Sequence, residues 1–215
     1  MGHVPLLLVD LDDTLVDRTA AFRGWAESFV AERGLPEGAL EALVEEDRSG
    51  RRPREEFVVA VTDRLGLERP LTVGYLADYV AGFVPDVGVL DALARARAAG
   101  WTIVVVTNGG LPQLSKLAIA GLEHSVDAAL VSGLEGVRKP DPRLFRLAAE
   151  RAGEPLEGAW MVGDDPVADV GGAASVGIAS AWLHRGRPWP SGLEPPTATV
   201  DSFADAVRLV LSNAA

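Results

Sequence analysis

The chain contains no cysteine and very little histidine or lysine. Among its 215 residues there are three histidines, and Lys116 and Lys139 are the only lysines among 20 basic residues. Without cysteine the protein has no disulfide, no thiolate nucleophile, no zinc–cysteine site and no iron–sulfur cluster. Three histidines leave little room for a histidine-rich metal site. Because lysine is so rare, the position of each lysine is informative.

Long hydrophobic runs and excess positive charge are also missing. The longest early apolar run, Val4–Val9, leads directly into Asp10 and is too short for a membrane span or a signal peptide. The formal net charge of −11 argues against a nucleic-acid partner, because phosphate backbones repel a net anion. We therefore expect a cytoplasmic protein that binds neither membrane nor nucleic acid. Its hydrophobic fraction of 48% is ordinary for a globular protein with a buried core.

Short apolar segments alternate with helical patterns over much of the chain. A buried parallel strand has such a continuous apolar run, and alternation with helices is typical of a doubly wound sheet. The sequence thus predicts an α/β fold with a Rossmann-like parallel sheet. The expected strands are Val4–Asp10, Trp101–Thr107, Asp127–Val131, Ala159–Gly163, Ile178–Leu183 and a weaker Thr197–Val200. The expected helices are Val89–Ala99, Pro112–Ala120, Pro142–Ala152, Pro166–Val176 and Ser202–Leu211.

Residues 16–86 interrupt this alternation, since they contain no strand-like run. They are predicted to form an inserted α-helical cap domain, whereas residues 1–15 and 87–215 form the α/β core domain. The expected cap helices are Arg18–Arg33, Glu37–Asp47, Arg54–Leu65 and Thr72–Phe83.

Acidic residues follow two of the predicted strands. Asp10 and Asp12 lie at the carboxyl end of the first strand, and Asp164 and Asp165 follow the strand that ends at Gly163, with Asp169 a few residues later. Ligands of open α/β sheets bind outside the carboxyl ends of the strands. Carboxylates gathered there repel one another unless a cation lies between them, and oxygen ligands of this kind suit Mg²⁺.

Two further positions at strand or helix junctions suit an anion. Thr107 ends a strand and is followed by Asn108 and two glycines, so its hydroxyl and nearby N–H groups can be presented to a phosphate. Lys139 stands just before a helix, where a cation opposes the helix dipole. Its position would be explained if its positive charge offsets the negative charge of several carboxylates and a phosphate.

Taken in order, these residues resemble the haloacid dehalogenase-like superfamily, in its subfamily with a helical cap in the first insertion position. The first motif of that family matches Asp10, Asp12 and Thr14, and its second matches Thr107. Its third motif matches Lys139 within Lys-Pro-Asp-Pro. The fourth matches the series Gly163, Asp164, Asp165 and Asp169.

The resemblance implies a phosphatase that works through an aspartyl-phosphate. Asp10 would be the nucleophile, and Asp12 would protonate the leaving group and then deprotonate water. Mg²⁺ would be held by Asp10, the Asp12 backbone carbonyl and Asp164. Thr107, the Asn108 backbone and Lys139 would bind the phosphate oxygens.

The roles of three matched residues stay open. Thr14 has a supporting or undecided role. Of Asp165 and Asp169, one could hold a water molecule on the metal and the other could orient Lys139, but a purely structural role is an equal alternative for either.

The presence of Asp12 favours phosphate ester hydrolysis over the other reactions found in this family. Members that displace halide need no acid at this position, and the phosphonate hydrolases use a cap lysine that residues 16–86 lack. The substrate is therefore expected to be a small phosphorylated metabolite. The alternatives are a sugar phosphomutase of the same family and a non-catalytic binding or regulatory protein. A monomer and a homodimer are both compatible with the sequence.

Arginines cluster between two predicted cap helices. Arg51 or Arg52 could reach a second anionic group on the substrate, whereas the alternative is a solvated loop in an arginine-rich protein.

Overall fold

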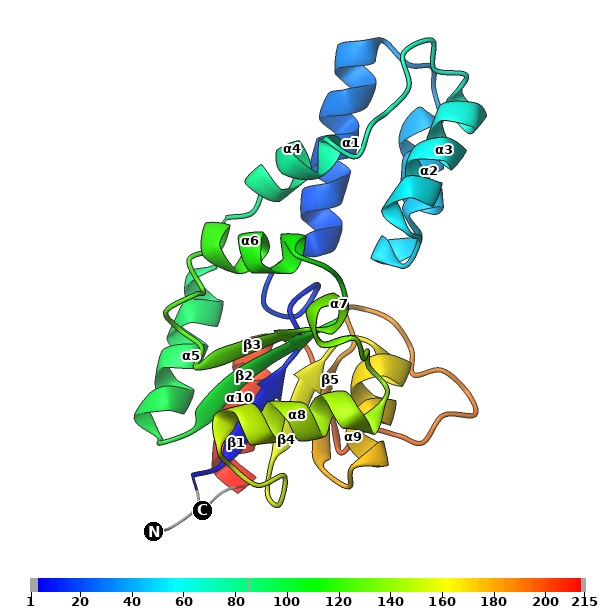
Figure 1. Cartoon of the computed structure of the whole chain (residues 1–215). Coiled ribbons are helices and arrows are strands. Elements are labelled where there is room, and N and C mark those ends of the chain that lie inside the picture. The colour runs from blue at the N-terminus through cyan, green and yellow to red at the C-terminus, as the bar shows by residue number, and fades with distance from the viewer. Residues whose placement is uncertain (1–3, 85, 214–215) are drawn as a thin grey trace. The chain divides into compact units, whose positions relative to one another are not determined.

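The computed structural model describes residues 4–84 and 86–213, and the chain divides into two compact units. One unit comprises Met1–Val16 and Val84–Ala215, and the other is Asp17–Phe83. The first contains the sheet and the second contains only helices (Figure 1).

The sheet has six parallel strands, as predicted. Their order is β3-β2-β1-β4-β5-β6, so β1 lies in the interior between β2 and β4. Each strand falls within its expected segment, which confirms the predicted α/β class. The strands are β1 Leu6–Val9, β2 Thr102–Thr107, β3 Ala128–Val131, β4 Trp160–Gly163, β5 Ala179–Leu183 and β6 Ala198–Val200.

Helices cover both faces of the sheet (Figure 1). On one face, α8 (Pro142–Ala152) and α9 (Gly172–Ser175) pack over alternate strand residues such as Leu6, Leu8 and Val104. On the other face, α5 (Val87–Ala98) and α10 (Phe203–Asn213) pack against each other and against the strands. A sheet buried on both faces explains why its central strands β1, β2 and β4 are apolar at nearly every position.

The other helices of this unit lie near the strand ends. Helix α6 (Pro112–Ile119) follows β2, and a short helix that the sequence pattern did not predict, α7 (Ser132–Glu135), follows β3. The expected helix 166–176 is divided into a π-helical segment, Pro166–Gly171, and α9. In that wider turn the Val170 N–H reaches back five residues to the Asp165 carbonyl at 3.3 Å.

The helical unit contains α1 (Arg18–Arg33), α2 (Ala39–Asp47), α3 (Arg54–Leu65) and α4 (Tyr75–Ala81). Aromatic rings form its core, with Phe22 at 5.8 Å from Phe57 and 5.9 Å from Tyr79 between ring centroids. The buried Arg18 guanidinium lies 2.5 Å from Asp47, and Arg54 lies 3.0 Å from the same carboxylate oxygen. These ion pairs join α1, α2 and α3.

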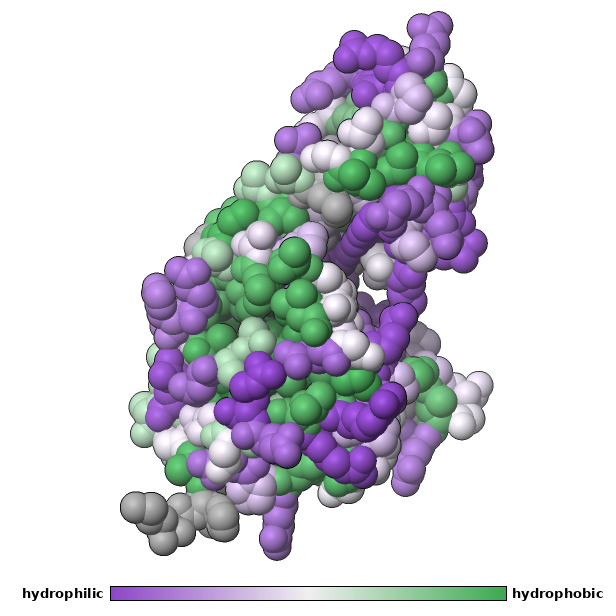
Figure 2. All heavy atoms as spheres, viewed as in Figure 1, coloured by the Kyte–Doolittle hydropathy of each residue, from purple (hydrophilic) through white to green (hydrophobic). Residues whose placement is uncertain are grey.

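The surface over α6 and α7 is notably apolar (Figure 2). Leu111, Leu114 and Leu134 are exposed there, at 65%, 39% and 53% of their full area. Among the helices of residues 4–84 and 86–213, none is both long and apolar enough to cross a membrane.

Candidate active site

The strand order brings three predicted site residues to one edge of the sheet. Asp10 directly follows β1, Thr107 is the last residue of β2, and Asp164 directly follows β4. Since β2 and β4 both neighbour β1, these three chain positions are adjacent. The Asp10 N–H donates to the Val162 carbonyl at 2.9 Å, which extends the β1–β4 ladder to the carboxylate itself.

Lys139 links two buried carboxylates at this edge. Its Nζ lies 2.6 Å from Asp10 Oδ1 and 2.6 Å from Asp169 Oδ1. The Asn108 side chain fixes the Lys139 backbone: Oδ1 accepts from its N–H at 2.9 Å, and Nδ2 donates to its carbonyl at 3.0 Å. Lys139 is only 2% exposed, so both its ammonium and its backbone are held in place.

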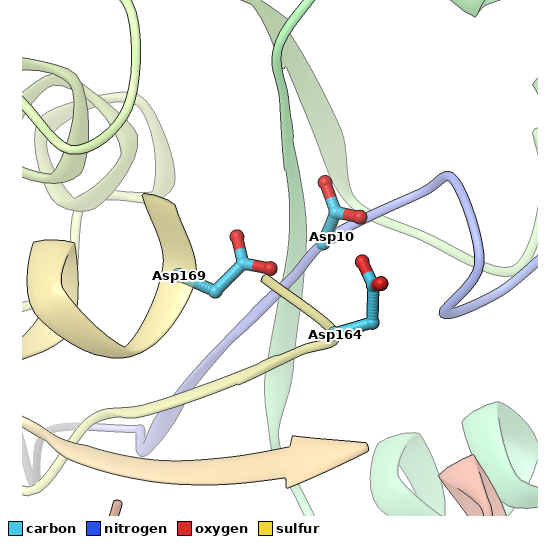
Figure 3. A group of neighbouring side chains, drawn as sticks. All are labelled: Asp10, Asp164 and Asp169. Carbon is cyan, nitrogen blue, oxygen red and sulfur yellow. The ribbon is translucent and has the colours of Figure 1, made fainter. Parts of the chain in front are cut away.

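Asp10, Asp164 and Asp169 form an acidic group suited to a cation (Figure 3). One carboxylate oxygen from each lies within 4.8 Å of the others. Donors that are all oxygen fit a hard divalent cation such as Mg²⁺. Asp169 already accepts from Lys139 Nζ through Oδ1 and from the Asp165 N–H, at 2.9 Å, through Oδ2. Both carboxylate oxygens of Asp169 thus already have short contacts within the protein.

Asp169 approaches β4 so closely that Gly163 has no room for a side chain. A Cβ at Gly163 would lie 2.2 Å from Asp169 Oδ2. The glycine therefore permits the contact between Asp169 and Lys139.

The electrostatics of this group follow from burial and from like charge. Burial raises the pKa of Asp10 to about 7, although Lys139 opposes the shift. Burial, together with the nearby Asp10 charge, raises the pKa of Asp164 to about 7. Burial also raises the pKa of Asp169. Burial alone would lower the pKa of Lys139, but Asp10 and Asp169 outweigh it and raise that pKa.

These shifts predict how the stability of the metal-free protein depends on pH. The carboxyls of Asp10 and Asp164 have pKa values near 3.8 when unperturbed and about 7 in the fold. Between those values the folded protein binds more protons than the unfolded chain, so stability falls as pH rises through this window. We expect the urea midpoint in EDTA to decline from about pH 4 to about pH 7, and the decline to be shallower in Asp164→Asn. An equal slope in this variant would contradict the prediction.

Asp12 lies on a tight loop after Asp10. The Leu11 carbonyl accepts from the Leu15 N–H at 2.9 Å, and the Asp13 N–H donates to the Val16 carbonyl at 2.8 Å. Two residues from α6 hold the Asp12 side chain. Lys116 Nζ lies 2.6 Å from both carboxylate oxygens, and Gln113 Nε2 donates to Oδ2 at 3.1 Å.

The sequence pattern did not predict that Gln113 and Lys116 contact Asp12. The rarity of lysine was a usable signal for Lys116, but no spacing rule relates α6 to a loop about 100 residues earlier. Gln113 also donates to Thr107 Oγ1 at 2.7 Å, so it connects two residues that the motifs had identified separately.

Thr14, Asp165 and Asp169, whose roles the sequence left undecided, have different contacts in the structure. The Thr14 hydroxyl is buried at a long 3.5 Å from Asp10 Oδ2. The Asp165 carboxylate caps the following turn by accepting from the N–H groups of Val167 and Ala168, at 2.9 and 3.0 Å. Asp169 is the residue of this pair that contacts Lys139.

Arg187 is a further residue that the sequence reasoning did not single out. Its Nη2 donates to the Asp164 carbonyl at 2.7 Å and to Oδ2 of the same residue at 2.9 Å. It comes from the loop after β5 and places positive charge beside one of the candidate cation ligands.

Arg51 and Arg52 belong to the helical unit. Arg52 pairs with Glu46 within that unit, and Arg51 is exposed. A substrate contact by either residue stays a prediction.

Comparisons with known proteins agree with this geometry. Residues 4–177 match the family model of haloacid dehalogenase-like hydrolases. Phosphoserine phosphatase of Thermus thermophilus is 46% identical over 121 residues, which cover 55% of this chain and 46% of the relative. This chain thus aligns with about half the length of that relative. Glyceraldehyde 3-phosphate phosphatase of Pyrococcus abyssi is 28% identical over 200 residues, covering 86% of this chain and 83% of the relative.

Solved structures show the same fold at low identity. The putative hydrolase YfnB of Bacillus subtilis, crystallised with magnesium, superposes with a TM-score of 0.76 at 22% identity over 97% of this chain and 99% of that chain. The L-2-haloacid dehalogenase of Xanthobacter autotrophicus gives 0.75 at 23% identity, over 96% and 98% of the two chains. The family match spans most of the sequence and includes Asp10, Asp12, Thr107, Lys139, Asp164 and Asp169, and so the chain belongs to the haloacid dehalogenase-like hydrolases.

Proposed function

We propose that the protein hydrolyses a small phosphate monoester through a phosphorylated Asp10, with Mg²⁺ as cofactor. One observation carries this proposal above the others. A buried carboxylate, Asp10, is held 2.6 Å from Lys139 at the carboxyl edge of the sheet, with Asp12 on the adjoining loop. This arrangement combines a nucleophile, a fixed positive charge and a second carboxylate for proton transfer.

In the first half-reaction an Asp10 oxygen attacks phosphorus. The Oδ–P bond forms while the bond from phosphorus to the ester oxygen breaks. Asp12, in its protonated form, gives its proton to the departing oxygen, which leaves as an alcohol.

In the second half-reaction Asp12 acts as a base. It takes a proton from water as the water oxygen attacks phosphorus and the Asp10–phosphorus bond breaks. Inorganic phosphate leaves, Asp10 returns as a carboxylate, and Asp12 is again protonated.

Residues around Asp10 stabilise the charge that the phosphoryl oxygens carry during both steps. The Lys139 ammonium supplies positive charge at the nucleophile, and the Thr107 hydroxyl and the Asn108 backbone N–H are the donors from the end of β2. Donors fixed before the reaction are worth more than mobile ones, because they need no reorganisation in the transition state.

The carboxylates of Asp10 and Asp164, with the Asp12 backbone carbonyl, would hold Mg²⁺. The bound ion supplies charge neutralisation, which lowers the repulsion between a phosphate dianion and an anionic nucleophile. The pKa of Asp10, raised to about 7 by burial despite the neighbouring Lys139, indicates how costly that negative charge is without a metal ion.

The presence of Asp12 supports ester hydrolysis over dehalogenation. Halide leaves without a proton, whereas an alkoxide leaving group needs one. The relatives named as phosphatases act on phosphoserine and on glyceraldehyde 3-phosphate. We propose these two esters as the first substrates to test.

The test is phosphate release from p-nitrophenyl phosphate, phosphoserine, glyceraldehyde 3-phosphate and nucleoside 5′-monophosphates. We expect turnover with Mg²⁺ and a loss of at least about 10²-fold in EDTA, restored by added Mg²⁺. A denatured sample serves as the blank and EDTA-treated protein as the matched control.

Undiminished activity in EDTA would rule out the metal part of the proposal. Absence of phosphate release from every ester would rule out the hydrolase part. Activity with a sugar monophosphate only when its bisphosphate is added would instead identify a phosphomutase.

A further inference from the structure

Helix α6 buries two polar residues, Gln113 and Lys116, beside the apolar Leu117. Gln113 and Lys116 are 5% and 2% exposed, whereas Leu114 and Ile119 on the same helix are 39% and 42% exposed. A surface helix normally buries its apolar stripe and exposes its charges. Burying an ammonium and an amide while leaving leucine in water costs free energy, so these polar groups need compensating contacts.

The compensating contacts are with Asp12. Lys116 Nζ lies 2.6 Å from each Asp12 oxygen, and Gln113 Nε2 donates to one of them at 3.1 Å. Gln113 and Lys116 are three residues apart, so they project from the same side of α6. Together they fix both the position of the carboxylate and its rotation.

The same helix ties Asp12 to the end of β2. Gln113 Nε2 donates to Thr107 Oγ1 at 2.7 Å, so one amide contacts both the proton-transfer carboxylate and a phosphate-binding hydroxyl. A Cβ on Gly109 would lie 2.8 Å from Gln113 Cγ, so a glycine at this position keeps the space that the Gln113 side chain uses. The turn after β2 is thus shaped around this side chain.

We infer that Lys116 and Gln113 are positioning residues that orient the Asp12 carboxylate for proton transfer. This inference rests on the proposed function, in which Asp12 is the acid and then the base. Asp12 needs such support because it lies on a loop with a side chain that is 26% exposed, whereas its partner Lys116 is 3% exposed on a helix. Displacing a catalytic group by about 1 Å can cost about 100-fold in rate.

The test uses Lys116→Met and stopped-flow kinetics with p-nitrophenyl phosphate. Nitrophenolate is a good leaving group that needs little protonation, so phosphorylation of Asp10 should proceed at nearly the wild-type rate. Hydrolysis of the phosphoenzyme needs Asp12 as a base and should slow by about 10- to 100-fold. We therefore expect a burst of about one nitrophenolate per active site followed by a slow steady state. For alkyl phosphates the burst phase itself should slow.

A double-mutant cycle distinguishes positioning from a general structural role. If Lys116 acts only through Asp12, adding Lys116→Met to Asp12→Asn should change the rate by less than about 2-fold. Ser115→Ala, on the exposed side of α6, is the matched control and should leave both phases unchanged. Lys116→Arg should recover part of the lost rate, because the guanidinium can also donate to a carboxylate.

Several outcomes would overturn the inference. The inference would be wrong if Lys116→Met left the steady-state rate unchanged or raised it. It would also be wrong if Lys116→Met lowered the rate by the same factor in the wild-type and Asp12→Asn backgrounds. If Lys116→Met does not fold, Gln113→Leu is used instead, because it removes a neutral donor to Asp12. It should show the same burst and a smaller decrease in the steady-state rate. A wild-type protein without Asp10-dependent turnover would refute the proposed function and with it this inference. If the wild type is active, Asp10→Asn is inactive and Lys116→Met is unaffected, the proposed function stands and only this inference is refuted.

Discussion

Asp10→Asn is expected to lower kcat by at least about 10⁴-fold, since removing a covalent nucleophile takes away the reaction path and not merely one contact. The amide has nearly the same shape as the carboxylate but does not attack phosphorus. The measurement is nitrophenolate release with Mg²⁺, and the loss should be similar for alkyl phosphates.

The fold should survive this substitution. Asp10 is buried, and burial raises the pKa of its carboxyl to about 7, so the charged form is costly there. A neutral amide avoids that cost but loses the charge-assisted bond to Lys139. We expect the two effects to offset each other to within about 2 kcal/mol in the free energy of unfolding. Asp63→Asn, at an exposed position in α3, is the control and should leave kcat unchanged. Turnover above about 1% of wild type in Asp10→Asn would refute the nucleophile assignment.

Lys139→Met is expected to have the largest effect on stability. The substitution leaves Asp10 and Asp169 without their shared ammonium, at side-chain exposures of 9% and 1%. Breaking a buried ion pair by removing one partner costs about 3–5 kcal/mol, because the remaining charge is buried and uncompensated. We expect a loss of this size in urea unfolding at pH 8 in EDTA. The loss should be smaller at pH 5, where protonation neutralises the raised-pKa carboxyls.

Two further variants separate the stability effect from catalysis. Adding Asp169→Asn to Lys139→Met removes one of the stranded charges and should restore part of the stability. It should not restore turnover, because the phosphate still lacks the Lys139 ammonium, and we expect kcat to remain about 10²- to 10³-fold low. Arg143→Met is the matched control, since Arg143 pairs with Asp141 on the surface at 71% exposure. It should cost less than about 1 kcal/mol. A loss in Lys139→Met no greater than that in Arg143→Met would contradict the prediction.

Both lysines of the chain are buried against carboxylates of the site. Lys139 contacts the proposed nucleophile, and Lys116 contacts the proposed acid and base. The 18 arginines that make up the rest of the 20 basic residues include the surface pairs of the helices, such as Arg64 with Glu45. An ammonium is a compact point charge that fits between close carboxylates, whereas a planar guanidinium needs more space.

The sequence by itself determined the strands and the family, and it predicted which residues gather at one edge of the sheet. Buried parallel strands read as apolar runs, and in an open α/β sheet the residues that follow them lie at one edge. Asp10, Thr107 and Asp164 could therefore be grouped from their places in the chain. The resemblance to haloacid dehalogenase-like hydrolases is confirmed by the family match over residues 4–177.

Only the tertiary structure decided which side chains meet. It assigned Asp165, the residue before the π-helical segment, to capping that segment, and it placed Asp169, within the segment, against Lys139. It also brought Lys116 to Asp12 across 104 positions of sequence. A sequence pattern can show that a segment is helical. It does not show how the helix is rotated about its own axis when polar residues, here Gln113 and Lys116, lie on the buried side. The packing of α6 against the Asp12 loop sets that rotation, so its polar face became visible only in the folded chain.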